Sequence, residues 1–180
     1  MLFRSRSDVQ LATIRVGMLP TLAPRDAVAV DVHTIEAPTR SRVRVLARTR
    51  DDDLDLLADA QRVIGVGRGV DPSDYPALEP LMAVLDAPLA ASRKVTDAGW
   101  LPRSRQIGIT GRSIAPDLHV AVGTSGRFNH SVGFARAGTV LAIDVDPDAP
   151  VFDVADVGIV GDWRRVVELL VPAITRAMQG

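Results

Sequence analysis

The sequence predicts an α/β fold in which a doubly wound parallel sheet occupies residues 61–180 and a short β-rich segment, residues 1–60, precedes it. Three observations predict the sheet: apolar runs without polar alternation, helical patterns between those runs, and glycine turns where the runs end. Uniformly apolar strands are typical of parallel sheets, because helices cover both faces of such a sheet. Ligands of these folds bind beyond the carboxyl ends of the strands, where glycine turns let phosphates reach helix N-termini.

The strands and helices of the larger region follow one another along the chain. Residues 63–67 are an apolar run that ends in glycine, which predicts a buried strand and a turn. Residues 75–85 suit a helix, and residues 118–122 and 140–143 predict two further buried strands. We expect a short helix to open at Ser125-Gly126, and Asp162 to be the N-cap of a final amphipathic helix.

The first 60 residues have a different pattern. Residues 11–16, 28–32 and 42–46 alternate in a way that is typical of β-strands, and prolines separate them. Residues 51–53 are three consecutive aspartates ahead of an apolar pattern at residues 54–57, which predicts an exposed helix start. Consecutive carboxylates without spaced companions make a poor metal cage, so we expect no metal site there.

Composition excludes several classes of function. The chain has 180 residues, of which 47% are hydrophobic and 24% charged, and its net charge is −1. This near-neutral charge makes nucleic acid and anionic membranes poor partners. The absence of cysteine excludes disulfides, cysteine-ligated iron–sulfur clusters and thiol catalysis, and it fits a reducing compartment. No apolar run approaches the ~20 residues that span a bilayer, and residues 1–7 lack the apolar stretch of a secretory signal.

Four polar clusters follow the predicted strands, and each is ambiguous by itself. Residues 65–69 form a glycine turn that carries Arg68, and residues 91–100 carry Arg93. Residues 106–111 place Thr110 between glycines, and residues 123–130 end with His130 at the start of a helix. Each cluster taken singly can be explained by structure alone. The explanations are, in order, a glycine turn, a surface arginine, a threonine bonded to backbone and a structural histidine.

Together, the clusters resemble the FAD-binding domain of the electron transfer flavoprotein alpha subunit. The matching stretches are Gly67-Arg68-Gly69, Ala91-Ser92-Arg93, residues 106–111, Ala115-Pro116 and residues 125–130. The resemblance continues through residues 142–160 and covers about residues 61–175. It implies a Rossmann-like FAD-binding domain over residues 61–180. Residues 1–60 would then be a β-rich remnant of the family's amino-terminal domain, which is otherwise missing.

The resemblance also implies roles for individual side chains. Arg93, Thr110 and His130 would surround the isoalloxazine ring, with Ser92 nearby. Arg68 and residues 125–129 would contact the pyrophosphate, and Asp144 and Asp162 the adenosine half. The full set implied to contact FAD is Arg68, Ser92, Arg93, Gln106, Ile107, Gly108, Ile109, Thr110, Ser125, Gly126, Arg127, Phe128, Asn129, His130, Asp144, Asp162 and Trp163.

Three positions depart from the family pattern. Asp144 stands where the family has asparagine; it can accept from ribose hydroxyls but would repel a phosphate. Ile109 stands in place of glutamine, which removes a side-chain hydrogen bond and spares backbone contacts. Trp163 replaces an aliphatic residue, and we interpret it as a packing residue.

The implied function is electron transfer without catalysis. Single electrons would pass from flavin dehydrogenases, such as the acyl-CoA dehydrogenases of fatty acid beta-oxidation, to a quinone reductase or another acceptor. The implied partner is an electron transfer flavoprotein beta subunit in a heterodimer, without nucleic acid or membrane insertion. The implied location is the cytoplasm in a bacterium and the mitochondrial matrix in a eukaryote.

Two other functions stay open on the residues alone. The same fold could serve as a non-redox subunit that binds an adenine nucleotide or is purely structural, which Asp144 and the short amino-terminal region favour. It could also be an enzyme that uses a nicotinamide cofactor, although no general acid or base is placed for hydride transfer.

Overall fold

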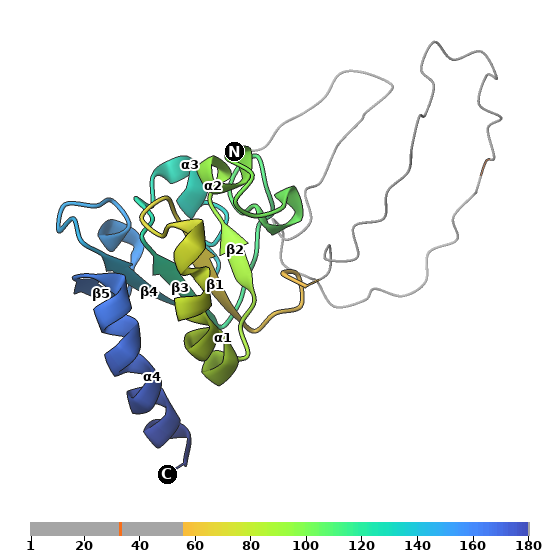
Figure 1. Cartoon of the computed structure of the whole chain (residues 1–180). Helices are drawn as coiled ribbons and strands as arrows, with labels where there is room; N and C mark the ends of the chain where they lie inside the picture. The colour runs from red at the N-terminus through yellow and green to blue at the C-terminus, as the bar shows by residue number, and fades with distance from the viewer. Residues whose placement is uncertain (1–32, 34–55, 180) are drawn as a thin grey trace.

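A five-stranded, all-parallel sheet forms the centre of the protein (Figure 1). The computed structural model describes residues 33 and 56–179, and the structural statements below refer to these. The strand order is β2-β1-β3-β4-β5. The strands are β1 (Arg62–Val66), β2 (Leu89–Ala91), β3 (Leu118–Val122), β4 (Thr139–Asp144) and β5 (Val157–Val160). The prediction of an α/β fold with a parallel sheet is therefore confirmed, whereas the strands predicted within residues 1–60 lie outside the described part.

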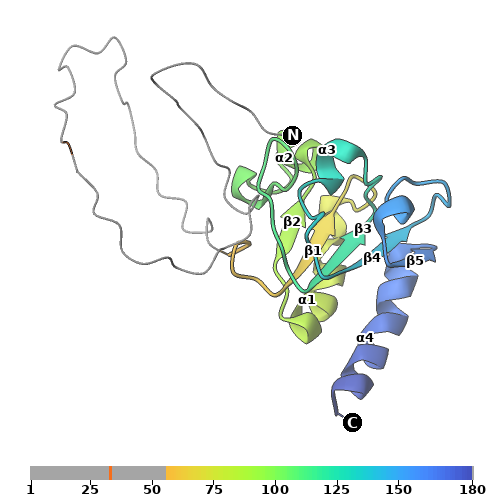
Figure 2. The same ribbon diagram turned by 180° about the vertical axis from the view of Figure 1, so that it is seen from behind.

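Helices cover the sheet and crowd one end of it. Helices α1 (Glu79–Leu85) and α4 (Trp163–Gln179) lie side by side, and they share one hydrophobic cluster. The short helices α2 (Arg93–Asp97) and α3 (Phe128–Ser131) lie together at the opposite end of the molecule from the C-terminus of α4 (Figure 2). Because α2 directly follows β2 and α3 follows β3 after a short loop, this is the carboxyl end of the strands.

Hydrophobic clusters lie on both faces of the sheet. On one face, Ile64, Val66 and Val120 pack with residues of α1 and α4. On the other face, Val63 packs with Phe134 and other residues of the connecting loops. Burial of each such side chain contributes about 1.5–3 kcal/mol. The uniformly apolar strands are thus explained by burial on both faces.

Several elements differ from the sequence prediction. The helix expected to open at Ser125-Gly126 is α3, which begins at Phe128. The helix predicted over residues 75–85 is a 3-10 helix, η2 (Pro72–Leu78), followed by α1. Proline has no N–H to donate, so Pro80 cannot bond to the carbonyl of residue 76 and one continuous α-helix over residues 75–85 is prevented. At residues 56–59 the predicted helix start is a turn, with Leu57 buried, and residues 51–55 lie outside the described part. Two further 3-10 helices, η3 (Arg103–Arg105) and η4 (Phe152–Val154), complete the connections. Within residues 56–179, no helix has both the length and the apolar character needed to cross a bilayer.

Candidate functional site

A cavity of about 540 Å³ opens at the carboxyl end of the sheet. Its wall consists of residues that follow β1, β2 and β3, residues of the loop after η3, and Asp144 at the end of β4. Chain connections from β1 lead to β2 on one side, while β3 lies on the other, so the cavity is at the topological switch point where open α/β sheets bind ligands. Its lining consists of Gly67, Arg68, Gly69, Ser92, Arg93, Lys94, Ile107, Ile109, Thr110, Gly123, Thr124, Ser125, Arg127, Asn129, His130 and Asp144.

Two glycine loops that line this cavity pack closely against each other. A Cβ atom on Gly67 would lie 2.2 Å from the carbonyl oxygen of Gly123. Gly123 itself has φ +56°, a left-handed conformation that disfavours other residues. The Gly69 N–H donates to the Gly123 carbonyl at 2.9 Å, which joins the loop after β1 to the loop after β3. The two loops therefore pack with main chain against main chain, and glycine is required where they touch.

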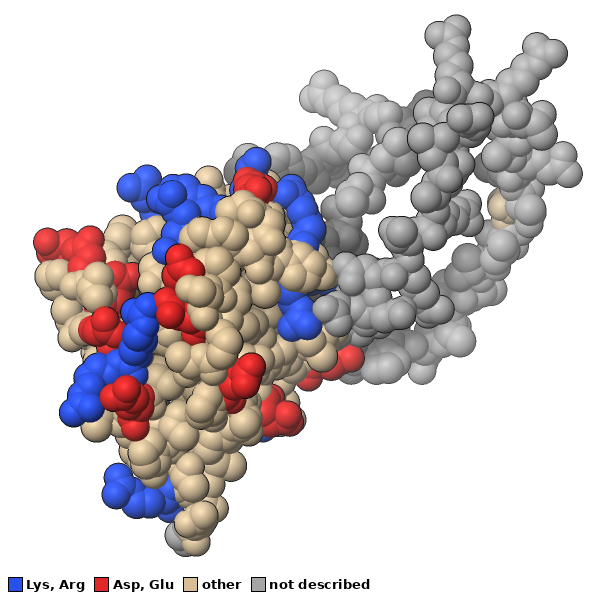
Figure 3. All heavy atoms as spheres, in the orientation of Figure 1, with Lys and Arg blue, Asp and Glu red and all other residues tan. Residues whose placement is uncertain are grey.

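The charge of the lining suits an anionic ligand. Arg68, Arg93, Lys94 and Arg127 line the cavity, with Asp144 as the acidic residue among the lining side chains. Figure 3 shows basic side chains gathered over the end of the molecule that carries α2 and α3. The Asp144 carboxylate accepts from the Asp146 backbone N–H at 3.0 Å, which occupies one of its oxygens. The cationic side chains would attract phosphate groups.

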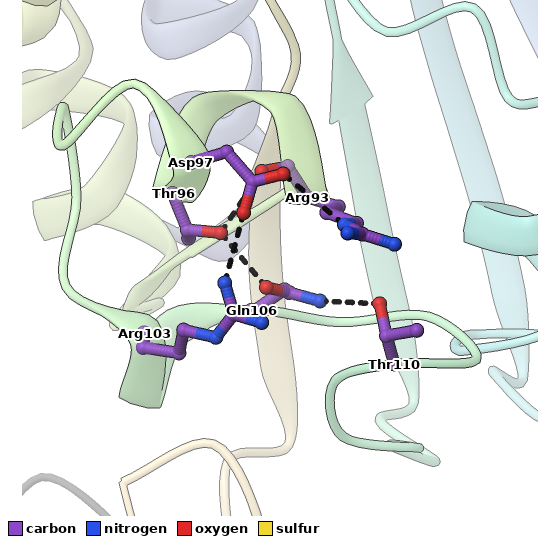
Figure 4. A network of polar contacts seen from close by, with 6 residues as sticks. All are labelled: Arg93, Thr96, Asp97, Arg103, Gln106 and Thr110. Atoms are coloured by element: carbon purple, nitrogen blue, oxygen red, sulfur yellow. Dashed lines mark hydrogen bonds and ion pairs between the residues drawn. The ribbon is translucent and has the colours of Figure 1, made fainter.

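Arg93 is held by an ion pair at the edge of the cavity. Its Nε donates to Asp97 Oδ2 at 3.1 Å, one turn along α2, while Arg103 Nη1 donates to Asp97 Oδ1 at 2.8 Å (Figure 4). Both pairs are solvent-exposed and add little to stability. Their effect is geometric: with Nε bound to Asp97, the outer nitrogens of Arg93 extend away from Asp97 (Figure 4).

Thr110 lies in front of a buried glutamine. The Nε2 of Gln106 donates to Thr110 Oγ1 at 2.8 Å, and Thr96 Oγ1 donates to Gln106 Oε1 at 2.8 Å. Gln106 is 1% exposed, whereas Thr110 is exposed and lines the cavity. Thr110 had been expected to bond to backbone if it were purely structural; its bond is instead to a side chain.

His130 lines the cavity and has an unpaired ring nitrogen. Its Nδ1 lies 3.3 Å from the Ile107 carbonyl oxygen. Because a carbonyl only accepts, Nδ1 carries the proton, and Nε2 of the neutral ring is an acceptor. Among the described residues, buried Nε2 has no hydrogen-bond partner. Burial lowers the pKa of His130, and the Ile107 carbonyl opposes this shift. Donation from Nε2 to a ligand would therefore require a protonated ring.

A second histidine, His119, lies behind this wall and was not singled out from the sequence. It is fully buried in β3 and stacks on Phe134 with ring centroids 4.2 Å apart, while Phe134 meets the His130 ring edge-on at 5.4 Å. Within residues 56–179, neither of its ring nitrogens has a partner. Burial, and to a smaller extent the proximity of His130, lower its pKa to about 3. The available signal was a polar residue inside the apolar run 118–122.

The structure brings together most of the residues predicted to contact a cofactor. Those that line the cavity are Arg68, Ser92, Arg93, Ile107, Ile109, Thr110, Ser125, Arg127, Asn129, His130 and Asp144. Lining residues that the sequence reasoning missed are Gly67, Gly69, Lys94, Gly123 and Thr124. All five lie within two residues of predicted ones, so a strand-end loop taken as a unit would have included them.

The other predicted residues lie beside or away from the cavity. Gln106 is buried behind Thr110, Gly108 and Gly126 belong to the loops around it, and Phe128 is 73% exposed. Asp162 caps α4: its Oδ1 accepts from the Arg164 backbone N–H at 2.8 Å. Trp163 is buried in the hydrophobic cluster of α1 and α4, which agrees with its interpretation as packing rather than cofactor contact.

Comparison with known proteins accounts for this arrangement. Residues 56–135 match the family model described as "Electron transfer flavoprotein FAD-binding domain". These residues belong to that family. The resemblance inferred from the sequence is thereby confirmed.

The relatives extend the similarity over nearly the whole chain. Electron transfer flavoprotein subunit alpha of Thermoanaerobacterium thermosaccharolyticum is 32% identical over 173 residues, which is 93% of this chain and 52% of the relative. The subunit alpha of Mycobacterium leprae is 33% identical over 177 residues, 95% and 55% of the two chains. Protein FixB of Escherichia coli O17:K52:H18 is 36% identical over 177 residues, 96% and 56%. The chain thus spans about half the length of the curated relatives it matches.

Proposed function

We propose that this chain binds FAD in the strand-end cavity and acts as the FAD-binding part of an electron transfer flavoprotein alpha subunit. In this role it carries single electrons and does not transform a substrate. Its partner is an electron transfer flavoprotein beta subunit, its donors are flavin dehydrogenases, and a quinone reductase or similar protein is the acceptor. We also propose a location in the cytoplasm of a bacterium or the matrix of a mitochondrion.

The observation that carries this proposal is the convergence of Arg93, Thr110 and His130. They come from α2, from the loop after η3 and from α3, and they line one cavity. A site that binds only an adenine nucleotide would need contacts to phosphate and ribose. It would not need three further side chains placed to contact a second ring system, such as the isoalloxazine of FAD. Arg93 and Thr110 offer a permanent positive charge and a hydroxyl, which suit a heterocycle that becomes electron-rich, and the His130 imidazole would do so when it is protonated.

The residues present also fit the rest of FAD. Backbone N–H groups beyond β3 and the cations Arg68, Lys94 and Arg127 suit two linked phosphates. The unpaired Nε2 of His130 is a buried polar atom that a ligand N–H or hydroxyl would satisfy. When bound, FAD would supply the one-electron redox chemistry. The protein would hold it in place, exclude water from one side of the ring and set the reduction potential through fixed charges.

Arg93 is the residue with the largest expected electrostatic effect. A charge-assisted hydrogen bond is worth about 1.5–3 kcal/mol. If most of that is gained on reduction, one such bond raises a one-electron potential by roughly 60–130 mV, because ~1.4 kcal/mol corresponds to 59 mV. Arg93→Ala should therefore lower the flavin potential by an amount in this range and leave the fold intact.

The test is a visible absorption spectrum followed by a reductive titration. The purified chain, with and without a beta subunit, is mixed with FAD, separated from free FAD and scanned. Bound flavin at about one per chain supports the proposal. Arg103→Ala is the matched control, because Arg103 shares the Asp97 partner but does not line the cavity. The flavin reduction potential of the FAD-bound Arg103→Ala variant should equal that of the unmodified holoprotein.

Two results would point to the other functions. A chain that binds adenosine phosphates but remains colourless with FAD would favour a non-redox nucleotide-binding subunit, which Asp144 in the cavity wall already suits. A chain that oxidises a substrate with a nicotinamide cofactor would favour an enzyme. Equal potentials in Arg93→Ala and the unmodified holoprotein would remove Arg93 from the flavin ring.

A further inference from the structure

The described part of the chain contains a row of three polar side chains that leads from the protein interior into the cavity. Thr96, Gln106 and Thr110 are joined by two hydrogen bonds of 2.8 Å (Figure 4). Thr96 comes from α2, Gln106 from the end of η3 and Thr110 from the loop that follows. Thr96 and Gln106 are buried, and Thr110 meets the cavity. Only the last of the three is therefore able to touch a ligand.

The row has a direction because an amide has two different ends. The Oε1 of Gln106 accepts from Thr96, so Nε2 faces Thr110 and donates to its Oγ1. The Thr110 oxygen then uses a lone pair as acceptor, and its own proton is not consumed by Gln106. That proton can be donated to an acceptor atom in the cavity. Since Gln106 is 1% exposed, water cannot replace either of its partners.

This direction depends on which acceptor receives the Thr96 hydroxyl proton. This single proton lies within reach of two acceptors, Gln106 Oε1 at 2.8 Å and the Arg93 backbone carbonyl at 3.0 Å. If the proton went only to the Arg93 carbonyl, two oxygen lone pairs would face each other between Thr96 and Gln106. The amide would then favour the reversed orientation, in which Thr110 donates to Gln106 and offers the cavity only an acceptor.

We infer that Thr96 and Gln106 are positioning residues that make the Thr110 hydroxyl a hydrogen-bond donor toward the ligand. This rests on the proposed function, since the ligand is FAD. A donor at this point stabilises a ring atom that gains electron density, so the row favours the reduced form of the ligand over the oxidised one. Thr96 and Gln106 act through Thr110 and touch no ligand themselves.

The first test uses the full chain without ligand. In a ¹⁵N-resolved NMR spectrum, the Gln106 side-chain amide protons should show through-space contacts to the Thr110 methyl group and slow exchange with water. Contacts to the Thr96 methyl group instead would mean the reversed orientation and would overturn the inference. This measurement does not depend on FAD binding. It therefore decides the inference even if the unmodified chain binds no FAD, a result that would defeat the proposed function separately.

The second test measures FAD dissociation constants for the oxidised and the reduced ligand. Thr110→Val should raise the ratio of the reduced to the oxidised constant by about fivefold, the effect of one neutral hydrogen bond. Thr96→Val should raise it in the same direction, and Thr96→Ser should restore it. In the Thr110→Val background, Thr96→Val should have no further effect, because Thr96 acts only through Thr110.

A matched control distinguishes the effect of Thr96→Val from a general effect of removing a threonine hydroxyl. Thr175 lies on α4, where its Oγ1 donates to the Val171 carbonyl at 2.9 Å, and Thr175→Val should leave the ratio unchanged. An unchanged ratio in Thr96→Val would overturn the inference. The inference would also be overturned if Thr96→Val changed the ratio equally in the unmodified chain and in the Thr110→Val background. Thr96 would then act by a route that does not include Thr110.

Discussion

Acidification should destabilise this domain through His119, and replacement of His119 by phenylalanine should remove most of that effect. His119 is fully buried, and neither ring nitrogen has a partner among the described residues. Burial lowers its pKa from 6.5 to about 3, with a smaller contribution from His130. The folded state therefore holds His119 neutral at pH values where the unfolded chain is already protonated.

The sign and the size follow from the two pKa values. Above pH 6.5 neither the folded nor the unfolded state binds a proton at His119, so His119 takes nothing from the free energy of unfolding there. As pH falls from 6.5 toward 3, the unfolded state binds a proton at His119 and the folded state does not. The free energy of unfolding therefore decreases. Each pH unit in this window costs about 1.4 kcal/mol, so the loss at about pH 5 is roughly 2 kcal/mol. His130, whose pKa is also lowered, adds in the same direction.

The assay is urea unfolding of the unmodified chain, His119→Phe and His33→Gln at about pH 8 and about pH 5. The measured quantity is the difference in unfolding free energy between the two pH values, which cancels any packing change in the variant. His33 is exposed, so its replacement removes no buried imidazole and serves as the matched control. If His119→Phe loses as much stability on acidification as the unmodified chain, the account of His119 is wrong.

Three further substitutions test the scaffold, all by urea unfolding at neutral pH. Gly67→Ala should cost about 3 kcal/mol or more, because its Cβ would meet the Gly123 carbonyl at 2.2 Å, whereas Gly161→Ala, with only an ordinary contact at 3.8 Å, should be nearly neutral. Trp163→Ala should cost about 3–5 kcal/mol, since the side chain is buried in the core; a loss below ~1 kcal/mol would contradict that placement. Asp162→Ala should cost about 1 kcal/mol through loss of the α4 cap, and Asp162→Asn should recover most of it.

The sequence predicted the sheet well where strands are buried on both faces. Residues 118–122 are an uninterrupted buried strand in the structure, as the apolar run indicated. β5 was not predicted, because it is short, contains Gly158 and is largely exposed at the sheet edge, so no burial pattern marks it. The 3-10 helix before α1 was also missed, since helical periodicity alone does not register that Pro80 cannot donate to residue 76.

The sequence was enough to predict which loops form the site, but less of the contacts between their side chains could be predicted. Parallel strands bring their carboxyl ends to one edge, which is enough to place Arg93, Thr110 and His130 near each other. The roles of buried neighbours depend on which atoms meet across loops. Thr96 and Gln106 are ten residues apart, and nothing in their spacing indicates that one orients the other. Trp163 was included by its position next to Asp162, although the first turn of α4 directs it into the core.

The close packing of the two glycine loops distinguishes the residues that fix the backbone of the cavity from those that set its chemistry. Gly67 and Gly69 pack against the main chain of Gly123, so a side chain at any of these glycines would push apart the loops after β1 and β3. Other lining side chains, such as Ser92, Arg93 and Thr110, are not among the atoms that meet at this contact. A redesign of the cavity for a different heterocycle would therefore begin with the wall and leave both glycine loops intact.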